Sequence, residues 1–209
     1  MKRAEREIYE RLTGGLSRPS KMPGWSYSLP AGAHCNVGKQ LLHVKGSVCN
    51  DCYAQKGHYV FPAVTMAQLR RLEKVKFEPR WVEAMTALIG SKREKYFRWH
   101  DSGDLMSFTH LDKIVQVAKN LPDYQFWLPT LEHVLVRNYL SLAGSFPPNL
   151  AVRLSTAMID TAPISTPLCT SSVVSDNSFT CPASKQGNVC GDCRMCWDQG
   201  VKHVSYRQH

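Results

Sequence analysis

The sequence predicts an α/β protein built on a small partial (β/α) barrel-like parallel sheet, followed by an irregular, cysteine-rich C-terminal segment. Two observations carry this prediction. Between residues 95 and 155 the spacing of apolar residues alternates between that of strands and that of helices. The loops between these elements are short, so we expect the strands to pair in parallel through right-handed crossovers.

The individual elements follow from apolar spacing and from the residues that end helices and turns. Residues 1–13 have the pattern of an amphipathic helix, and residues 13–24 form a loop rich in Gly, Pro and Ser. Gly90 stands where a helix ends, and Ser107 stands where a helix is capped. We predict strands at 25–30, 95–100, 124–129 and 149–155, and helices at 63–78, 80–90, 107–121 and 130–144.

A chain of 209 residues is expected to form a single domain around one core. Within it, residues 1–24 hold the N-terminal helix and loop, residues 25–160 hold the β/α core, and residues 161–209 hold the cysteine-rich segment. The core includes a long Gly-containing stretch, residues 31–58, that carries three cysteines. A loop of this length inside a compact domain is usually functional.

Composition narrows the class of protein. The net charge of +9 makes a nucleotide, a nucleic acid or another acidic partner plausible, although a basic, well-solvated surface is an equal explanation. No apolar run approaches the roughly 20 residues that span a bilayer, and the charged N-terminus lacks the apolar centre of a signal peptide. We therefore expect a cytoplasmic protein without a membrane partner. In that compartment, eight cysteines indicate metal or redox chemistry rather than disulfides.

Polar residues follow the predicted strands, at the edge where ligands bind in parallel sheets. Thr130 and Ser155 follow two of them. Each polar residue has a structural explanation as well: a helix cap at Thr130, a left-handed turn at Gly103, a core histidine at His100. The density of ionisable groups after the strand at 95–100 favours a cofactor-binding role for His100, Asp101, Ser102, Gly103 and Asp104.

The C-terminal cysteines have the spacing of metal ligands. The last three follow one another as C-x2-C-x2-C, which brings three thiolates around one small centre. Zinc usually takes its ligands as two separated pairs, whereas this close repeat matches iron–sulfur ligation. We predict an iron–sulfur cluster here, with zinc as the alternative metal, held by Cys181, Cys190, Cys193 and Cys196.

The N-terminal group contains three cysteines: Cys35, Cys49 and Cys52. Three ligands on a four-iron cluster leave one iron open for a substrate or cofactor. Two alternatives remain open. His34, His43 or His58 could complete a zinc site, or the two cysteine groups could meet in one shared site. Cys169 stands alone and is expected to be no ligand.

A cysteine loop after the first strand, ending in Cys49-x2-Cys52-Tyr53 and followed by β/α units, resembles the radical S-adenosylmethionine superfamily. The resemblance implies a 4Fe-4S cluster whose open iron binds S-adenosylmethionine, with residues 102–104 near the cofactor's amino group and a second cluster at the C-terminal cysteines. The superfamily's usual C-x3-C-x2-C spacing would place the first cysteine at Lys45, so Cys35 would substitute from across a longer insertion.

A closer resemblance in layout is to the gene-product-eighty-eight family of phage and bacterial proteins. The matching stretches are "LPAGAHC", "CNDCYAQKG", "RWHDSGDL", "FWLPT", "VRLS" and "CGDCRMCW", which span residues 29–197. This resemblance implies metal-bearing cysteines and a viral origin, hence a host-cytoplasmic location, and it names no reaction.

Three hypotheses follow. The first is a redox or radical enzyme that carries one or two 4Fe-4S clusters and acts on a nucleotide or nucleic acid. The second is a non-catalytic iron–sulfur protein whose cluster stabilises the fold or transfers electrons. The third is a zinc-stapled nucleic-acid-binding module, suggested by the charge and by aromatic residues such as Trp81, Trp99 and Trp127.

Overall fold

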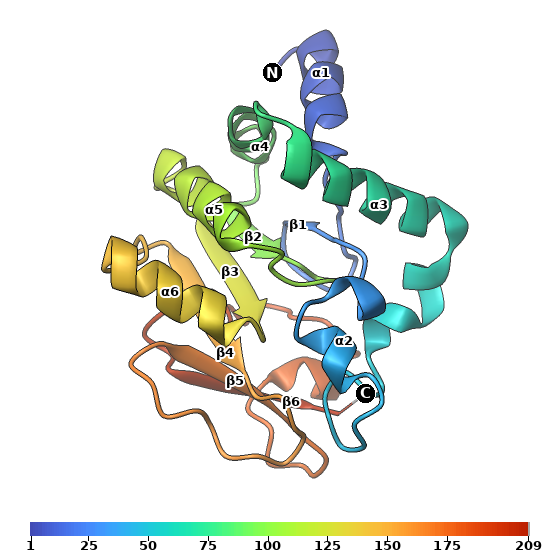
Figure 1. Ribbon diagram of the computed structural model, residues 1–209, viewed down its shortest axis with the longest axis vertical. Helices are drawn as coiled ribbons and strands as arrows, with labels where there is room; N and C mark the ends of the chain where they lie inside the picture. The colour runs from blue at the N-terminus through green and yellow to red at the C-terminus, as the bar shows by residue number, and fades with distance from the viewer. Residues whose placement is uncertain (209) are drawn as a thin grey trace.

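The computed structural model describes residues 1–208. Its centre is a sheet of six strands that are all parallel and lie in chain order from β1 to β6 (Figure 1). The sheet does not close on itself, so the predicted partial (β/α) barrel-like fold is confirmed. The strands are β1 (Trp25–Tyr27), β2 (Tyr96–Trp99), β3 (Gln125–Thr130), β4 (Leu150–Ser155), β5 (Cys169–Val174) and β6 (His203–Arg207).

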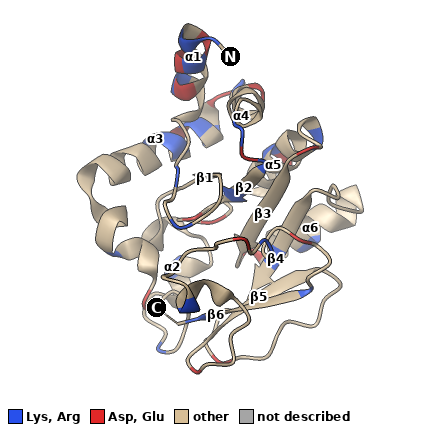
Figure 2. Cartoon of the chain, turned by 180° about the vertical axis from the view of Figure 1, so that it is seen from behind, with Lys and Arg blue, Asp and Glu red and all other residues tan. Residues whose placement is uncertain are grey.

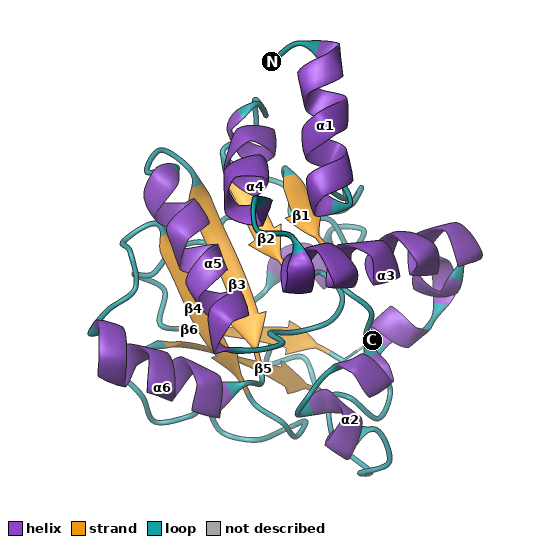
Figure 3. Ribbon diagram, turned by 45° about the horizontal axis from the view of Figure 1, so that its top comes forward, coloured by secondary structure: helices purple, strands orange, loops and turns teal. Residues whose placement is uncertain are grey.

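Helices provide the first three crossovers and lie on one side of the strands (Figure 3). The β1-to-β2 connection is the longest and holds two long helices as well as several short turns, whereas one helix each joins β2 to β3 and β3 to β4. The connections to β5 and β6 contain only irregular chain and one short turn. The helices are α1 (Arg3–Thr13), α2 (Gly38–Leu41), α3 (Pro62–Phe77), α4 (Trp81–Gly90), α5 (Phe108–Asn120) and α6 (His133–Ala143), with 3-10 turns η1 (Gly32–His34), η2 (Tyr53–Gln55), η3 (Gly57–Val60) and η4 (Pro182–Lys185).

The two faces of the sheet are covered differently. Side chains alternate between the faces along each strand, so Phe97 and Trp99 point to one side and Tyr96 and Arg98 to the other. The first face packs against the helices and forms the main core. The second, which we call the inner face, carries Trp127 and is covered by the C-terminal cysteine segment. The sheet therefore has a helical layer on one side and a cysteine-rich layer on the other.

Most predicted elements are present, with shifted ends. Ser107 caps α5 as predicted, since its Oγ accepts a hydrogen bond from the His110 N–H at 3.1 Å. The prediction of a cap at Thr130 was wrong: Thr130 is the last residue of β3, and α6 begins three residues later. Its hydroxyl instead accepts the Glu132 N–H at 3.0 Å, inside the turn.

The C-terminal segment is more regular than predicted, because it contributes β5 and β6. Both strands are rich in hydroxyl side chains and lack the apolar alternation that would reveal them in the sequence. They are stabilised in part by side-chain hydrogen bonds: the two ring nitrogens of His203 lie 2.9 Å from Thr170 Oγ1 and 3.0 Å from Ser172 Oγ. No helix among the described residues is long and apolar enough to cross a membrane.

Candidate functional site

The N-terminal cysteine loop, residues 31–58, lies across the carboxyl edge of the sheet (Figure 1). Backbone and side-chain hydrogen bonds fasten it to the ends of successive strands. The Val37 N–H donates to Glu132 Oε1 at 2.8 Å, beyond β3, and the Val48 N–H donates to the Ala157 carbonyl at 2.9 Å, beyond β4. Asn36 donates to the Leu105 carbonyl at 3.3 Å, after β2. The loop is thus placed where ligands bind in parallel α/β sheets.

Two of the three cysteines of this loop, Cys35 and Cys49, lie beside Gly38, and Cys52 lies close enough to affect the pKa of both. A Cβ on Gly38 would lie 2.8 Å from Cys35 Cβ, 3.6 Å from Cys35 Sγ and 3.4 Å from Cys49 Sγ. Glycine therefore leaves space beside two of the thiols that any larger residue would fill. The pKa of Cys35 is raised to about 12 and that of Cys49 to about 11, chiefly by burial, with smaller contributions from Asp104 and the neighbouring thiols. Burial also raises the pKa of Cys52.

The raised pKa values mean that these thiols stay protonated unless a bound cation stabilises the thiolate form. Burial and mutual repulsion both disfavour the thiolate, and a bound cation would reverse both effects. Thiolates are also the ligands that iron–sulfur clusters and zinc prefer. The chemistry of the donor set therefore fits a thiophilic metal centre.

The positions of the side chains fit a metal centre less well than their chemistry does. Among residues 1–208, no three His, Cys, Asp or Glu side chains are grouped so that they could hold a metal ion. A tetrahedral zinc site needs its thiolate sulfurs about 4 Å apart, as follows from a Zn–S distance near 2.3 Å. A four-iron cluster is a larger body, and its ligands stand further apart. His34, His43 and His58, the histidines of the zinc alternative, are all solvent-exposed.

The turn after β2 holds the predicted cofactor residues, and most of them are engaged with the protein. His100 adopts a left-handed backbone conformation with φ of 56°. Its ring is buried and lies 5.0 Å from the ring of His110. The Ser102 hydroxyl donates to the Leu29 carbonyl at 2.8 Å. Gly103 has φ of 79°, and a Cβ there would lie 2.7 Å from Leu29 Cβ, so glycine is required.

Asp104 is the member of the turn whose charge acts on the cysteines. Its Oδ1 accepts hydrogen bonds from Thr130 Oγ1 at 2.6 Å and from the Leu105 N–H at 2.7 Å, and its Oδ2 accepts the Leu131 N–H at 2.9 Å. Burial raises its pKa to about 7 in spite of these donors. Oδ2 keeps one free acceptor position.

Asp101 belongs to a network that reaches the cysteine loop through two tyrosines. Tyr53, which follows Cys52, donates to the Asp101 carbonyl at 2.7 Å, and Tyr59 donates to Asp101 Oδ2 at 3.1 Å. Arg98 Nη2 donates to the Tyr53 hydroxyl oxygen at 3.0 Å. The network therefore joins the N-terminal cysteine loop to the inner face of the sheet.

The C-terminal cysteines lie on that inner face, held by Arg153. Its guanidinium, fully buried in β4, donates to the carbonyls of Met195 at 2.6 Å, Asp198 at 2.7 Å and Cys196 at 2.9 Å. Trp197 Nε1 donates to the Phe97 carbonyl of β2 at 2.9 Å. These bonds fix the segment across the sheet from β2 to β4.

The four predicted C-terminal ligands lie close enough for some of them to affect one another's pKa. Burial raises the pKa of Cys181, and Cys193 raises it further. Burial and Cys181 likewise raise the pKa of Cys190, whereas the charge of Arg98 lowers it. The pKa of Cys196 is raised by burial to about 11, although a 3.2 Å hydrogen bond with the Tyr206 hydroxyl and the charge of Arg153 oppose the rise.

The two cysteine groups are separate places in the fold. The thiols that act on Cys35 are Cys49 and Cys52, and those that act on Cys190 are Cys181 and Cys193. One group lies at the carboxyl edge and the other on the inner face (Figure 1). Cys169 belongs to neither group: it is buried in β5, and its Sγ donates to the Gln199 carbonyl at 3.5 Å.

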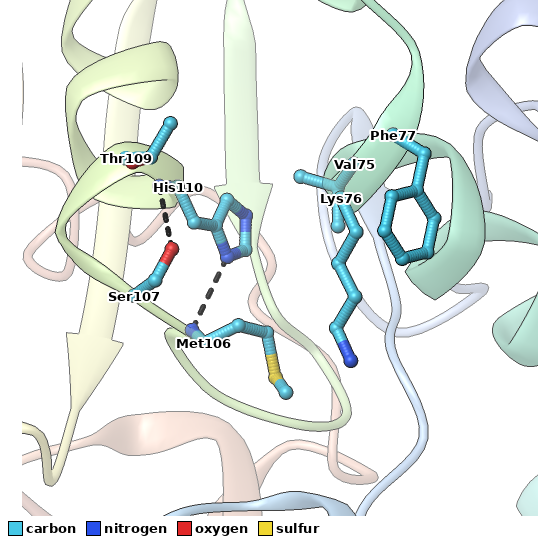
Figure 4. A pocket seen from close by; sticks show the side chains of 7 residues that line it. All are labelled: Val75, Lys76, Phe77, Met106, Ser107, Thr109 and His110. Atoms are coloured by element: carbon cyan, nitrogen blue, oxygen red, sulfur yellow. Dashed lines mark hydrogen bonds between the residues drawn. The ribbon is translucent and has the colours of Figure 1, made fainter.

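A small pocket of about 280 Å³ lies elsewhere, between the C-terminal end of α3 and the N-terminal end of α5 (Figure 4). His110 forms one wall, with its Nδ1 accepting the Met106 N–H at 3.3 Å. Lys76 and Phe77 form the opposite wall. The cysteines do not line this pocket.

Comparison with known proteins identifies the family. The sequence model of the gene product 88 family matches residues 2–199. The chain belongs to the gene product 88 family. The resemblance expected from the cysteine and strand-end motifs is therefore confirmed, and it covers nearly the whole chain. No curated protein and no solved structure matches the chain.

Sequence reasoning missed the two arginines of the inner face. Arg98 and Arg153 stand in the middle of predicted strands whose neighbours are apolar. A charged residue in a buried strand needs partners, so their position was a usable signal. The partners themselves are backbone carbonyls and a tyrosine far away in the chain, and the sequence does not reveal them.

Proposed function

We propose that this gene product 88 protein binds iron–sulfur clusters at its two cysteine groups and uses the N-terminal one for redox or radical chemistry on a nucleotide or nucleic acid. The observation that carries the proposal is the position of Cys35, Cys49 and Cys52. Three thiols lie at the carboxyl edge of a parallel sheet, close enough to affect one another's pKa and beside the turn that follows β2. The six parallel strands in chain order add support for the radical S-adenosylmethionine resemblance.

Different residues of the chain would have different roles in this chemistry. Cys35, Cys49 and Cys52 would hold a four-iron cluster and leave one iron open, while Asp104 would accept a hydrogen bond from the amino group of S-adenosylmethionine. When bound, such a cluster supplies one electron and an open coordination position. Tyr53 fixes the loop, since it bonds both Asp101 and Arg98.

The C-terminal group is suited to a different task. Cys181, Cys190, Cys193 and Cys196 would supply all four ligands of a cluster, which leaves no iron open. Arg153 and Trp197 anchor this segment on the inner face. A second cluster there would stabilise the layer that covers the sheet, or carry electrons.

Elemental analysis of anaerobically purified protein tests the proposal. We expect a brown protein with about eight irons and eight sulfides per chain, as two four-iron clusters require. Cys49→Ser and Cys193→Ser should each remove about half of the iron, and Cys169→Ser should remove none. Zinc without iron would contradict the proposal and would favour a zinc-stapled module. Equal iron loss in the Cys169→Ser control would show that the assignment of the ligands is wrong.

A non-catalytic iron–sulfur protein is the second candidate. It is favoured by the extent to which the residues of the turn after β2 are already bonded within the protein, as with Ser102 and Leu29. Adding S-adenosylmethionine with a one-electron reductant separates the two candidates. Formation of deoxyadenosine supports the radical enzyme, and unchanged cofactor supports the non-catalytic protein.

A further inference from the structure

A groove of about 670 Å³ lies at the amino edge of the sheet, the edge opposite to the N-terminal cysteine loop. The loop before β1, the start of β2 and the C-terminal cysteine segment enclose it. The loop before β1 is tied to the cysteine segment directly, since the Cys190 N–H donates to the Lys21 carbonyl at 2.9 Å. The lining residues are Arg18, Pro19, Ser20, Met22, Pro23, Gly24, Glu94, Lys95, Tyr96 and Arg194.

The groove is basic, and carboxylates neutralise few of its positive charges. Three of its lining residues are cationic, and Glu94 is the one acidic residue among them. Glu94 forms an ion pair with Arg18, with 3.2 Å between Oε1 and Nη2. Among residues 1–208, neither Lys95 nor Arg194 has a carboxylate within 4.0 Å. Figure 2 shows further lysine and arginine residues in the connection from α4 to β2, beside the groove.

Aromatic rings hold these cations in place. The Arg194 guanidinium lies 4.9 Å from the centre of the Tyr96 ring, and Lys95 Nζ lies 4.0 Å from that of Tyr124. Trp25 has Arg18 at 5.5 Å and Lys92 at 4.1 Å. Cation–π contacts position the charges without neutralising them, so the groove keeps a fixed positive field.

We infer that this groove binds single-stranded nucleic acid. Its cations would contact successive phosphates, and the Arg194–Tyr96 stack offers a planar surface for a base. Loops and strand ends form its walls, so it presents no helix for the major groove of a duplex. The inference deepens the nucleic-acid part of the proposed function and does not depend on its metal part.

The salt dependence of binding tests the inference. A fluorescein-labelled thymidine oligomer is titrated with the protein over a series of KCl concentrations, and the slope of log affinity against log salt is measured. Lys95→Gln and Arg194→Gln should each lower that slope by about 1 and weaken binding at 0.1 M salt by about five- to tenfold. The matched controls Lys119→Gln and Arg137→Gln remove exposed cations of α5 and α6 and should leave the slope unchanged.

Three results would overturn the inference. The first is an equal change in the groove variants and the controls. The second is equally tight binding of a duplex of the same length with the same sensitivity to Lys95→Gln, which would indicate a general polyanion. The third is the absence of binding. The iron content of each variant is measured alongside, because Arg194 donates to the Gly191 carbonyl at 2.6 Å and its loss could disturb the cysteine segment. If a variant has altered iron content but an unchanged slope of log affinity against log salt, the substituted cation has no role in binding. The result would then concern only the metal sites.

Discussion

The two cysteine regions of this protein are built in opposite ways. The C-terminal segment is fixed by a fully buried guanidinium and by a tryptophan that bonds the sheet backbone. The N-terminal loop is fixed at its margins, by bonds such as Val37 to Glu132, while two of its three thiols lie beside Gly38. The C-terminal segment has four cysteines and is anchored by Arg153 and Trp197. The N-terminal loop has three cysteines, with open space beside two of the thiols. Under the proposed function, ligand number and anchoring together would separate a structural site from a reactive one.

The largest expected effect comes from removing the C-terminal anchor. Arg153→Met should lower the free energy of unfolding by about 5 kcal/mol, because several buried carbonyls lose their donor at once and each costs about 1–3 kcal/mol. Amide exchange should rise first in residues 190–201 and later in the helices. Chemical denaturation with hydrogen exchange measures both. Arg137→Met removes an exposed arginine of α6 and should change little; a similar loss in that control would refute the role of Arg153 as the anchor.

Acid should loosen the N-terminal region before the C-terminal one. Burial lowers the pKa of His110 to about 3, and burial together with His110 also lowers the pKa of His100, which supports the turn beside the cysteine loop. A lowered histidine pKa gives stability that is complete above the unfolded pKa near 6.5 and is lost as the pH falls toward the folded value. Between pH 6.5 and 4.5 His110 alone should cost about 2 kcal/mol, and His100 should add to that loss, at no more than about 1.4 kcal/mol per pH unit for each group. Asp104, whose pKa is raised to about 7, gains a proton in the folded state over the same range and offsets about as much as one histidine, so the net loss should be about 2 kcal/mol.

Denaturation at several pH values checks this expectation. His110→Asn, whose Oδ1 stands where Nδ1 does and can accept the Met106 N–H, should flatten the dependence over this range. The exposed His43 provides the control, and His43→Gln should leave the curve as in the wild type. Exchange that rises first in residues 190–201 on acidification would contradict the expected order of loosening.

Adding a single methyl group at Gly38 should affect the N-terminal cysteine group and leave the C-terminal group unchanged. Gly38→Ala places a Cβ 2.8 Å from Cys35 Cβ, which should cost about 1–3 kcal/mol by overpacking and should close the space beside the thiols. We expect the variant to lose the iron of the N-terminal group and keep that of the C-terminal group. Gly90→Ala is the matched control, since Gly90 is also helical and its Cβ would meet only the Leu121 side chain, at 3.2 Å. Full iron in Gly38→Ala would show that the space has no role.

The smallest effect concerns the contact between the regions. Tyr53→Phe removes a hydroxyl that links Arg98 to the Asp101 carbonyl, and a hydrogen bond of this kind is worth about 1 kcal/mol. Limited proteolysis should cleave the loop at residues 42–61 faster in this variant. Tyr9→Phe, on α1, provides a tyrosine control away from both regions. Unchanged cleavage would mean that the link does not hold the loop.

The sequence predicted the parts that depend on local pattern. Apolar spacing revealed the strands around Phe97, Phe126 and Val152, because those positions alternate with polar ones or form continuous buried runs. Cysteine spacing predicted two cysteine groups, and a run of polar residues at a strand end predicted the turn that holds Asp104.

The parts that depend on distant partners were not predictable in this way. Strand β5 is held by hydroxyl groups, such as Ser172 bonded to His203, and its sequence has no apolar alternation. The functions of Arg98 and Arg153 depend on carbonyls and a tyrosine that the fold brings close. Thr130 looked like a helix cap because a hydroxyl before a helix usually is one, yet Asp104 binds that hydroxyl and keeps it within the strand.

The most direct test of the central claim compares the two groups one at a time. Cys193→Ser leaves the N-terminal group intact, and Cys49→Ser leaves the C-terminal group intact. The electron paramagnetic resonance spectrum of each reduced variant is recorded before and after adding S-adenosylmethionine. We predict that the spectrum changes in Cys193→Ser and stays constant in Cys49→Ser, because only the three-cysteine group leaves an iron open. A change in Cys49→Ser alone, or in neither variant, would contradict the division between an open and a closed site.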